Sequence, residues 1–378
     1  MKKILVTLML LTVMIHYGCD TEVAENEQEN DQQMEQYDPE EDDSLLYAPQ
    51  TGLRDFEVTA GEHGYLGVGW IELINDYFPN RLAFSDRELE AAEWIIETLL
   101  EMGFDESQIE MQTFGFDTGT SSWWGDASWS VEWFEELGYY DGLERIEQSQ
   151  NVILTIPGRS EKSIIIGAHY DGVDNPGISD NAGGIVLLLE NAYRMRDVDH
   201  YYTLQYVFFG AEEVGLIGAF YFADNMAQEE IDNLVMMINA DVIMDGPELV
   251  YAVGYVEELP VFPMDVLFEP VEISQNLLSE QVKGIADQLN ARSGTELLSK
   301  PSAVVSPTDQ LAFLQFGIPV MGFYGTNPAR YPETFVGDVL HSERDCLDFI
   351  VTNHPGRIER ALYQFGVFLE EVVSSEFE

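Results

Sequence analysis

Short apolar runs alternate with amphipathic segments over the second half of the chain. Six runs have the length and the β-branched or aromatic content of buried strands: 152–156, 163–168, 204–209, 234–240, 248–253 and 318–323. Between them, apolar residues recur at helical spacing in five segments: 185–195, about 215–226, 274–291, 311–316 and 356–373. Strands that alternate with helices predict an α/β fold, with a mostly parallel, mixed central sheet and helices on both faces.

The first half of the chain has fewer regular patterns. Ser85 and Glu88 form the pattern of a capping box, which predicts a helix from there to about Met102. An alternating run at 109–114 predicts a strand.

Two segments interrupt the α/β pattern as insertions. Residues 115–149 carry four of the six tryptophans of the chain, interleaved with glycine, serine and acids. This insertion has two interpretations, a lid over a substrate cleft or an aromatic core that covers one sheet edge. Residues 255–273, rich in proline, glutamate and phenylalanine, predict a surface excursion.

The N-terminus has the pattern of an export signal. Residues 1–18 begin with two lysines and continue with an apolar run at 4–15, which is too short for a membrane span. Cys19 follows a glycine, as in bacterial lipoprotein signals, although His16 and Tyr17 depart from the usual lipobox. We expect a signal peptide over 1–18 and a secreted or cell-surface protein, lipid-anchored through Cys19 to the outside of a bacterial membrane. Ordinary secretion and an uncleaved anchor are the alternatives.

Acidic residues outnumber basic ones 69 to 17, for a formal net charge of -52. This excludes nucleic acid and anionic membrane as electrostatic partners, so membrane contact is expected only through the lipid anchor. Residues 20–43 hold 12 acids and no lysine or arginine, which predicts a disordered acidic tether over 19–50 and a folded domain over 51–378. The remaining acidity has two interpretations, adaptation to salty or alkaline surroundings and attraction of cationic substrates.

Histidines and carboxylates stand where the predicted strands end. Seven such residues lie directly after a strand, before a glycine-rich helix start or in the last loop: His169, Asp171, Asp180, Glu212, Glu213, Asp241 and His341. Each alone has a structural explanation, such as a helix cap or a loop histidine. Together they are expected to converge, because the carboxyl ends of parallel strands meet at one edge of a sheet. Imidazole and carboxylate ligands without cysteine are typical of catalytic zinc, so the pattern predicts a metallohydrolase. His63, His200 and His354 have no comparable carboxylate context and are interpreted as structural.

The segments around these residues resemble a known family. Gly167-Ala168-His169-Tyr170-Asp171, the run 179–184 and the run 209–215 are similar to motifs of the dizinc aminopeptidase family of metallopeptidases, which also contains glutaminyl cyclases. Asn239-Ala240-Asp241 and the run 341–345 match its later motifs, and Thr308-Asp309-Gln310 does so loosely. The resemblance covers roughly residues 85–375. It implies a zinc aminopeptidase or phosphorylase-like fold.

The resemblance also implies a ligand set for two zinc ions. One ion would be held by His169, Asp180 and Asp241, and the other by Asp180, Glu213 and His341, with Asp180 bridging the two. In this family the peptide bond after the bridging aspartate is typically cis, which here is the bond to Asn181.

Two further roles follow from the resemblance. Asp171 would accept the second ring N–H of His169 and so fix its tautomer. Glu212 would be the general base, which takes a proton from a water bound between the two metal ions and hands it to the leaving amine. One departure is Leu340, which stands before His341 where some relatives carry a tyrosine; Tyr324 and Tyr331 are candidates for that role.

The implied activity is that of a zinc-dependent exopeptidase, an aminopeptidase that hydrolyses the N-terminal peptide bonds of peptide substrates. Two alternatives use the same fold. One is a glutaminyl cyclase, an acyltransferase with a single zinc ion, and the other is a non-catalytic relative that binds peptides. The complete ligand set and the paired Glu212-Glu213 favour the peptidase.

Overall fold

A computed structural model describes residues 59–116, 128–256, 273–300, 308–329 and 337–377 of the protein. The predicted signal peptide, Cys19 and the predicted acidic tether lie outside the described residues. So does most of the excursion at 255–273, whose two ends are joined by a backbone bridge between Tyr255 and Ser274.

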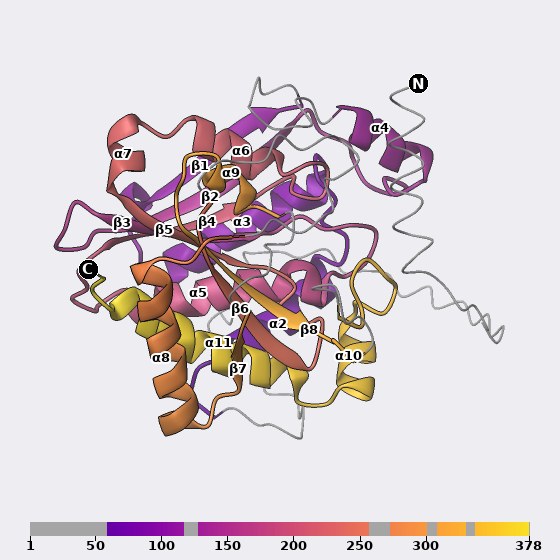
Figure 1. Cartoon of the computed structure of the whole chain (residues 1–378). Helices are drawn as coiled ribbons and strands as arrows, with labels where there is room; N and C mark the ends of the chain where they lie inside the picture. Colours follow the sequence, from indigo (N-terminus) through magenta and orange to yellow (C-terminus); the bar gives the residue numbers. More distant parts are fainter. Residues whose placement is uncertain (1–58, 117–127, 257–272, 301–307, 330–336, 378) are drawn as a thin grey trace.

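An eight-stranded mixed sheet forms the centre of the described part (Figure 1), in the order β1-β2-β4-β3-β5-β8-β6-β7. The middle strands β4, β3, β5 and β8 are mutually parallel, and antiparallel pairs occur between β1 and β2, β2 and β4, and β6 and β8. This confirms the predicted mostly parallel, mixed sheet. The strands are β1 (Ile109–Gly115), β2 (Gln148–Ile156), β3 (Ser163–His169), β4 (Thr203–Phe209), β5 (Leu234–Ala240), β6 (Glu248–Gly254), β7 (Leu297–Ser299) and β8 (Val320–Thr326).

Helices cover both faces of the sheet, as the alternation of strands and helices predicts. The larger core lies on one face under α2 (Tyr65–Tyr77), α3 (Asp86–Glu101), α5 (Gly183–Met195), α8 (Leu277–Ser293), α10 (Leu347–Asn353) and α11 (Arg357–Ser374). A smaller core on the other face lies under α6 (Ile217–Asp224), α7 (Gln228–Asn233) and α9 (Leu311–Leu314). Figure 1 shows α5, α8 and α11 below the sheet and α6, α7 and α9 above it. Because both faces are covered, β3 and β8 are buried along nearly their whole length.

Helix α3 begins at the predicted cap, but only half of the capping box forms. Ser85 Oγ accepts the N–H of Glu88 at 3.2 Å, as expected. The Glu88 carboxylate is fully buried and accepts hydrogen bonds from Phe84 N, Ser149 Oγ and Ala211 N. The Glu88 half of the predicted capping box is thus absent, and its carboxylate instead joins α3 to β2 and to the loop after β4.

The described part of the tryptophan-rich insertion packs as an aromatic cluster. It contains α4 (Ser128–Glu136), and three of its side chains, Val131, Phe134 and Tyr140, are buried in a third small core. The same core includes Ala211, Val214 and Ile217, which flank the loop after β4. This arrangement favours the interpretation as a structural core; Trp123 and Trp124 lie outside the described residues, and the lid stays a prediction.

No helix within the described ranges has the length and the apolar character needed to span a bilayer.

Candidate metal centre

The carboxyl ends of β3, β4 and β5 bring the predicted site residues to one edge of the sheet. His169 is the last residue of β3 and pairs in register with Phe209, the last residue of β4. Glu212 and Glu213 follow β4 after a turn, and Asp241 directly follows β5. The parallel register of these three strands therefore places one imidazole and several carboxylates side by side.

Two further residues reach the same place from loops. Asp180 lies in the π-turn η2 (Ile178–Ala182), immediately before α5, and its peptide bond to Asn181 is cis, as the resemblance implied. His341 lies in the loop between β8 and α10. The backbone at His341 has a positive φ of 48°, and positive φ values also occur at Ala211 and Val242, each directly beside a predicted site residue. Such sparsely populated conformations persist where the surrounding structure holds them, often at functional sites.

The contacts divide into two groups that share Asp180. In the first, His169 Nε2 lies 3.0 Å from Asp180 Oδ1 and 3.2 Å from Asp241 Oδ1. In the second, His341 Nε2 lies 3.1 Å from Asp180 Oδ2 and 3.2 Å from Glu213 Oε2. The two oxygens of Asp180 thus face the two histidines, one each.

The donor set fits metal ions. Each group has three side-chain donors within 4.8 Å of one another, and all are nitrogen or carboxylate oxygen, as catalytic zinc prefers. Glu213 Oε1 is buried and has no hydrogen-bond partner among the described residues, so this lone-pair donor is available to a cation. The His169 side chain is 1% exposed, whereas that of His341 is 42% exposed, so the cluster opens to solvent on the His341 side.

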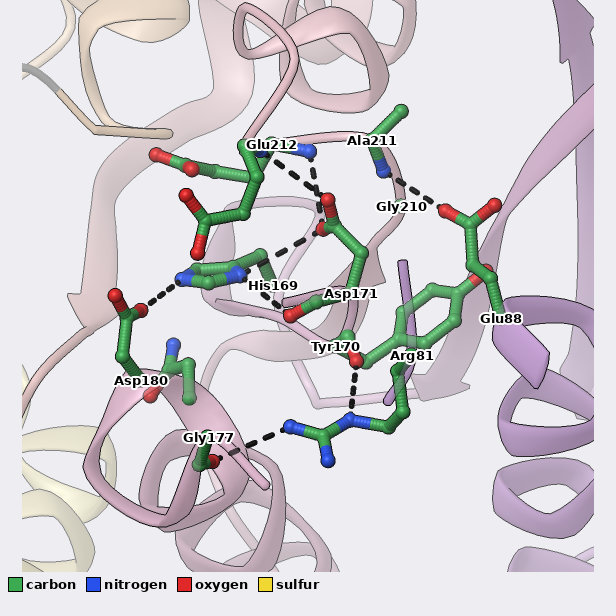
Figure 2. Close-up of polar contacts among 12 residues, drawn as sticks. Arg81, Glu88, His169, Tyr170, Asp171, Gly177, Asp180, Gly210, Ala211 and Glu212 are labelled. Atoms are coloured by element: carbon green, nitrogen blue, oxygen red, sulfur yellow. Dashed lines mark hydrogen bonds and ion pairs between the residues drawn. The ribbon is translucent and has the colours of Figure 1, made fainter. Parts of the chain in front are cut away.

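The side chain of Asp171 mainly binds backbone N–H groups of other site residues. Its carboxylate oxygens accept the N–H groups of Glu212 and Glu213 at 3.0 and 3.1 Å (Figure 2). Its Oδ1 lies 3.6 Å from His169 Nδ1, which is too long for a hydrogen bond, and the closer neighbour of that nitrogen is the carbonyl oxygen of Asp171 at 3.2 Å. In the structure the ring N–H of His169 therefore faces this carbonyl, and the carboxylate fixes the loop that carries Glu212 and Glu213.

Two other buried aspartates hold site loops in the same way. Asp345 accepts the N–H groups of Ser179 and Asp180 at 2.6 and 2.9 Å. Asp245 accepts those of Val339 and Leu340 at 2.7 and 2.9 Å, and also that of Gly337. Each carboxylate thus fixes the backbone on one side of a predicted ligand.

A buried arginine lies beneath the cluster. The Arg81 side chain is about as deeply buried as the core aromatics, at 1% exposure, and its guanidinium donates to the carbonyls of Tyr170 and Gly177 (Figure 2). Burial lowers the pKa of Arg81 to about 10, against the opposing effect of Asp345, Asp171 and Asp180, so it stays charged at neutral pH.

Several carboxylates surround the two histidines of the cluster, and these groups shift one another's pKa values. Loss of hydration alone would lower the pKa values of the buried His169 and the partly exposed His341. Carboxylates instead raise both pKa values well above their usual range, chiefly Asp241 and Glu212 for His169 and Glu213 and Asp180 for His341. Burial raises the pKa of Glu212 well above its usual range, against the opposing effect of His169 and with the help of Glu213. A carboxylate whose proton affinity is raised in this way is suited to acid–base work near neutral pH.

Glu212 lies beside the ligand atoms without belonging to either of the two groups that share Asp180. One of its carboxylate oxygens is within 4.8 Å of a His169 nitrogen and of a Glu213 oxygen. The side chain is partly exposed. It can therefore reach both the cluster and a bound molecule, which is the position that a general base requires.

Asp309, from the loosely matching motif, is buried behind the site. Its carboxylate oxygens have no hydrogen-bond partner among the described residues, and its pKa is raised well above the usual range, by burial first and then by Asp241 and Asp171 against the opposing effect of His169. Next to it, the Gln310 side chain accepts from Asn239 and donates to the hydroxyl of Tyr324.

Tyr324 and Tyr331 are the candidates for the role of the tyrosine that some relatives carry at the position of Leu340. The Tyr324 side chain is fully buried, with its hydroxyl 3.1 Å from Gln310 Nε2. A substrate has no direct access to it in this structure. Tyr331 lies outside the described residues.

Sequence reasoning missed four residues that support the site: Arg81, Asp245, Asp345 and Glu88 as a link to the loop after β4. Each acts on a partner more than 80 positions away, so no local pattern reveals the contact. The one signal for Arg81 was its place next to the apolar run Leu82-Ala83-Phe84, where an isolated cation is unusual. His63, His200 and His354 belong to none of the potential metal-binding groups in the described part of the chain.

Comparison with known proteins places these features in a family. The model of peptidase family M28 matches residues 151–366, which include all seven predicted site residues. The aminopeptidase YwaD of Bacillus subtilis is 31% identical over 101 residues, which is 26% of this chain and 22% of that protein. The first relatives of this kind are thus matched over only about a fifth of their own length.

Solved structures share the fold at low identity. The zinc aminopeptidase BSAP from Bacillus subtilis superposes with a TM-score of 0.59 at 17% identity, over 85% of this chain and 97% of that one. A glutaminyl cyclase from an Acidobacteriales bacterium gives 0.57 at 17% identity, over 86% and 99%. At this level of identity the likeness concerns the fold, which both activities use.

Proposed function

The chain belongs to peptidase family M28, and from that premise we propose that it is an aminopeptidase that depends on two zinc ions. His169, Asp180 and Asp241 would hold one ion, and Asp180, Glu213 and His341 the other. The observation that carries this proposal is that both groups are complete and share the two oxygens of Asp180.

This observation also favours the peptidase over the cyclase. A single-zinc cyclase needs only one set of ligands, and the pairing of His169 with Asp241 would then have no metal to hold. The histidine–carboxylate contacts of both groups are equally short in this chain, 3.0 to 3.2 Å. Two equally formed sets favour a site for two ions.

The chemistry is divided between the metal ions and the protein. Bound zinc would lower the pKa of a coordinated water and polarise the scissile carbonyl. Glu212 takes one proton from the attacking water as the new C–O bond forms, and it then delivers this proton to the nitrogen of the leaving amine as the peptide C–N bond breaks. Asp171 keeps Glu212 and Glu213 in place through their backbone N–H groups.

Removal of residues from the N-terminus fits the charge of the site. A free α-amino group is a cation near neutral pH, and the partly exposed carboxylate of Glu212 supplies an acceptor for it beside the ligand atoms. A blocked N-terminus has no such charge. We therefore propose unblocked peptides as the substrates.

The test is digestion of three matched peptides by the purified, zinc-loaded chain. One has a free leucine at its N-terminus, the second is its N-acetylated form, and the third begins with glutamine. We expect stepwise release of free amino acids from the first peptide and none from the second. Release of ammonia with a pyroglutamyl product from the third, without hydrolysis of the first, would instead assign the cyclase reaction.

For the place of action we propose the outer surface of a bacterial membrane, with an acyl chain on Cys19. The proposal is supported by the positive start, the apolar run and the glycine before Cys19. Incorporation of a labelled fatty acid in the producing bacterium tests it. Labelling that persists in Cys19→Ser would contradict it.

A further inference from the structure

Arg81 is a buried cation that contacts the backbone of the site, and burial of its charge must be compensated. It lies in the segment between α2 and α3, far in sequence from every predicted ligand. Removing a guanidinium from water is costly unless hydrogen bonds or an opposite charge compensate. Among the described residues no carboxylate lies within ion-pair distance of it; Asp345, Asp171 and Asp180 act on its charge only from farther away. Its hydrogen-bond partners must therefore be other groups.

Four backbone carbonyls provide that compensation. Arg81 Nε donates to Tyr170 O at 2.8 Å, Nη1 to Phe78 O at 2.8 Å and Pro176 O at 2.9 Å, and Nη2 to Gly177 O at 3.2 Å. The carbonyl of Arg81 itself accepts the N–H of Gly172 at 3.0 Å. An arginine offers five N–H donors on a planar fork of three nitrogens, whereas a lysine offers three on a single nitrogen and cannot reach the same four carbonyls.

Three of the four acceptors belong to the segments that carry two ligands, whereas Phe78 ends α2. Tyr170 stands between His169 and Asp171, and Pro176-Gly177 leads directly into the π-turn of Asp180. Figure 2 shows the guanidinium between these two stretches of chain. Arg81 therefore connects the backbone that carries His169 with the backbone that carries Asp180.

Gly177 shows how closely this contact is fitted. Its φ is +57°, and a Cβ at this position would lie 2.4 Å from the carbonyl oxygen of Asp180 and 3.0 Å from Arg81 Nη2. A side chain there would push apart the guanidinium and the ligand turn. A glycine is thus required for the contact as it stands.

From this arrangement, and resting on the proposed function, we infer that Arg81 is a positioning residue that sets His169 and Asp180 at the separation a metal ion requires. The charge and the hydrogen bonds of Arg81 have opposite effects on metal binding. A fixed positive charge near the cluster repels a divalent cation, whereas the four hydrogen bonds hold the ligands in place. If positioning dominates, removal of Arg81 weakens metal binding although it removes a repulsive charge.

The experiment measures zinc affinity of the metal-free protein by competition with a chelator. Arg81→Met removes both charge and hydrogen bonds, Arg81→Lys keeps the charge but not the fork, and Gly177→Ala keeps Arg81 while disturbing its contact. Arg159→Met, at a side chain 54% exposed, is the matched control for loss of an arginine. Circular dichroism checks that each variant is folded.

We expect a loss in zinc affinity of about 10- to 100-fold for Arg81→Met, as for other groups that orient metal ligands, with smaller losses for Arg81→Lys and Gly177→Ala and none for the control. Unchanged or tighter binding by Arg81→Met would overturn the inference, and so would full recovery by Arg81→Lys. If Arg81→Met does not fold, the affinities of Arg81→Lys and Gly177→Ala decide. A wild-type chain that binds no zinc would contradict the proposed function instead.

Discussion

At the sheet edge, the two imidazoles of the site lie within hydrogen-bond or ion-pair distance of four carboxylates, those of Asp171, Asp180, Asp241 and Glu213. Without metal, these groups must share protons. The pKa values of His169 and His341 are raised by the surrounding acids, and burial raises that of Glu212. The pKa of Asp180 is lowered because its hydrogen bonds to the two histidines outweigh its burial. In the metal-free protein the histidines are therefore cations that offset the charge of the acids.

This protonation predicts how metal binding depends on pH. Zinc binds neutral imidazole, so protons on His169 and His341 must leave when it binds. Because both pKa values are raised above the usual histidine value of 6.5, proton release persists above pH 6.5 and zinc affinity increases as pH rises through the raised values. Calorimetric titration in two buffers with different protonation enthalpies measures the protons released. Identical heats in the two buffers would contradict this prediction.

The same pKa shifts determine whether the stability of the metal-free fold rises or falls with pH. Each histidine has a higher pKa folded than unfolded, so its contribution to stability is fully present below pH 6.5 and is lost as pH rises through the folded value.

Glu212 and His341 predict different phenotypes for two single substitutions. Glu212→Gln keeps the shape of the side chain but cannot accept the proton, so turnover should fall by about 10²- to 10⁴-fold while zinc content is unchanged. His341→Ala should lower both activity and zinc content, because one donor of the second group is lost. Metal analysis and peptide hydrolysis on the same samples measure both. Normal turnover by Glu212→Gln would remove it as the base.

At the scale of elements, buried carboxylates fix the loops that carry the ligands. Asp171, Asp345 and Asp245 each accept backbone N–H groups beside a different ligand. The N–H groups in these irregular turns have no helix or sheet partner, and a buried carboxylate can satisfy two of them at once. The strand ends thus set the approximate positions of the ligands, and these acids set the loops between them.

Asp345 provides the test of this arrangement. Burial raises the pKa of Asp345 to about 8, so at pH 7 it is mostly protonated in the folded state, and its contribution to stability falls as pH rises toward that value. Asp345→Asn keeps one acceptor oxygen but sets its NH2 group, which only donates, against the second N–H, so it should cost about one of these two hydrogen bonds. Asp345→Ala leaves the N–H groups of Ser179 and Asp180 buried without an acceptor, at about 1–3 kcal/mol each. Urea unfolding of the metal-free protein compares them; equal losses for Asn and Ala would contradict this role.

The elements predicted from the sequence are those with a local signal. Helix α3 has a serine cap and a one-sided apolar face, and β5 was predicted with the bounds that the structure gives it. Helix α2 was not predicted, because it contains two glycines, has no side-chain cap and is apolar over most of its surface. Strand β7 has only three residues, and its position depends on pairing with β6 rather than on its own sequence.

At the scale of the whole molecule, the predicted ligands could be found from the sequence more easily than the residues that hold their loops in place. His169, Asp241 and Glu213 follow strand ends, so a correct assignment of three strands was enough to bring them together. Arg81 and Asp245 act on backbone groups 89 to 96 positions away, which only the tertiary fold brings near. The sequence pattern therefore indicates which groups meet, and the fold determines what holds them at the right separation.

The measurement that tests the central claim most directly is anomalous diffraction at the zinc absorption edge from crystals of the zinc-loaded protein. We predict two peaks, one among His169, Asp180 and Asp241 and the other among Asp180, Glu213 and His341, with an oxygen of Asp180 at each. A single peak, or peaks that none of these side chains contacts, would contradict the account.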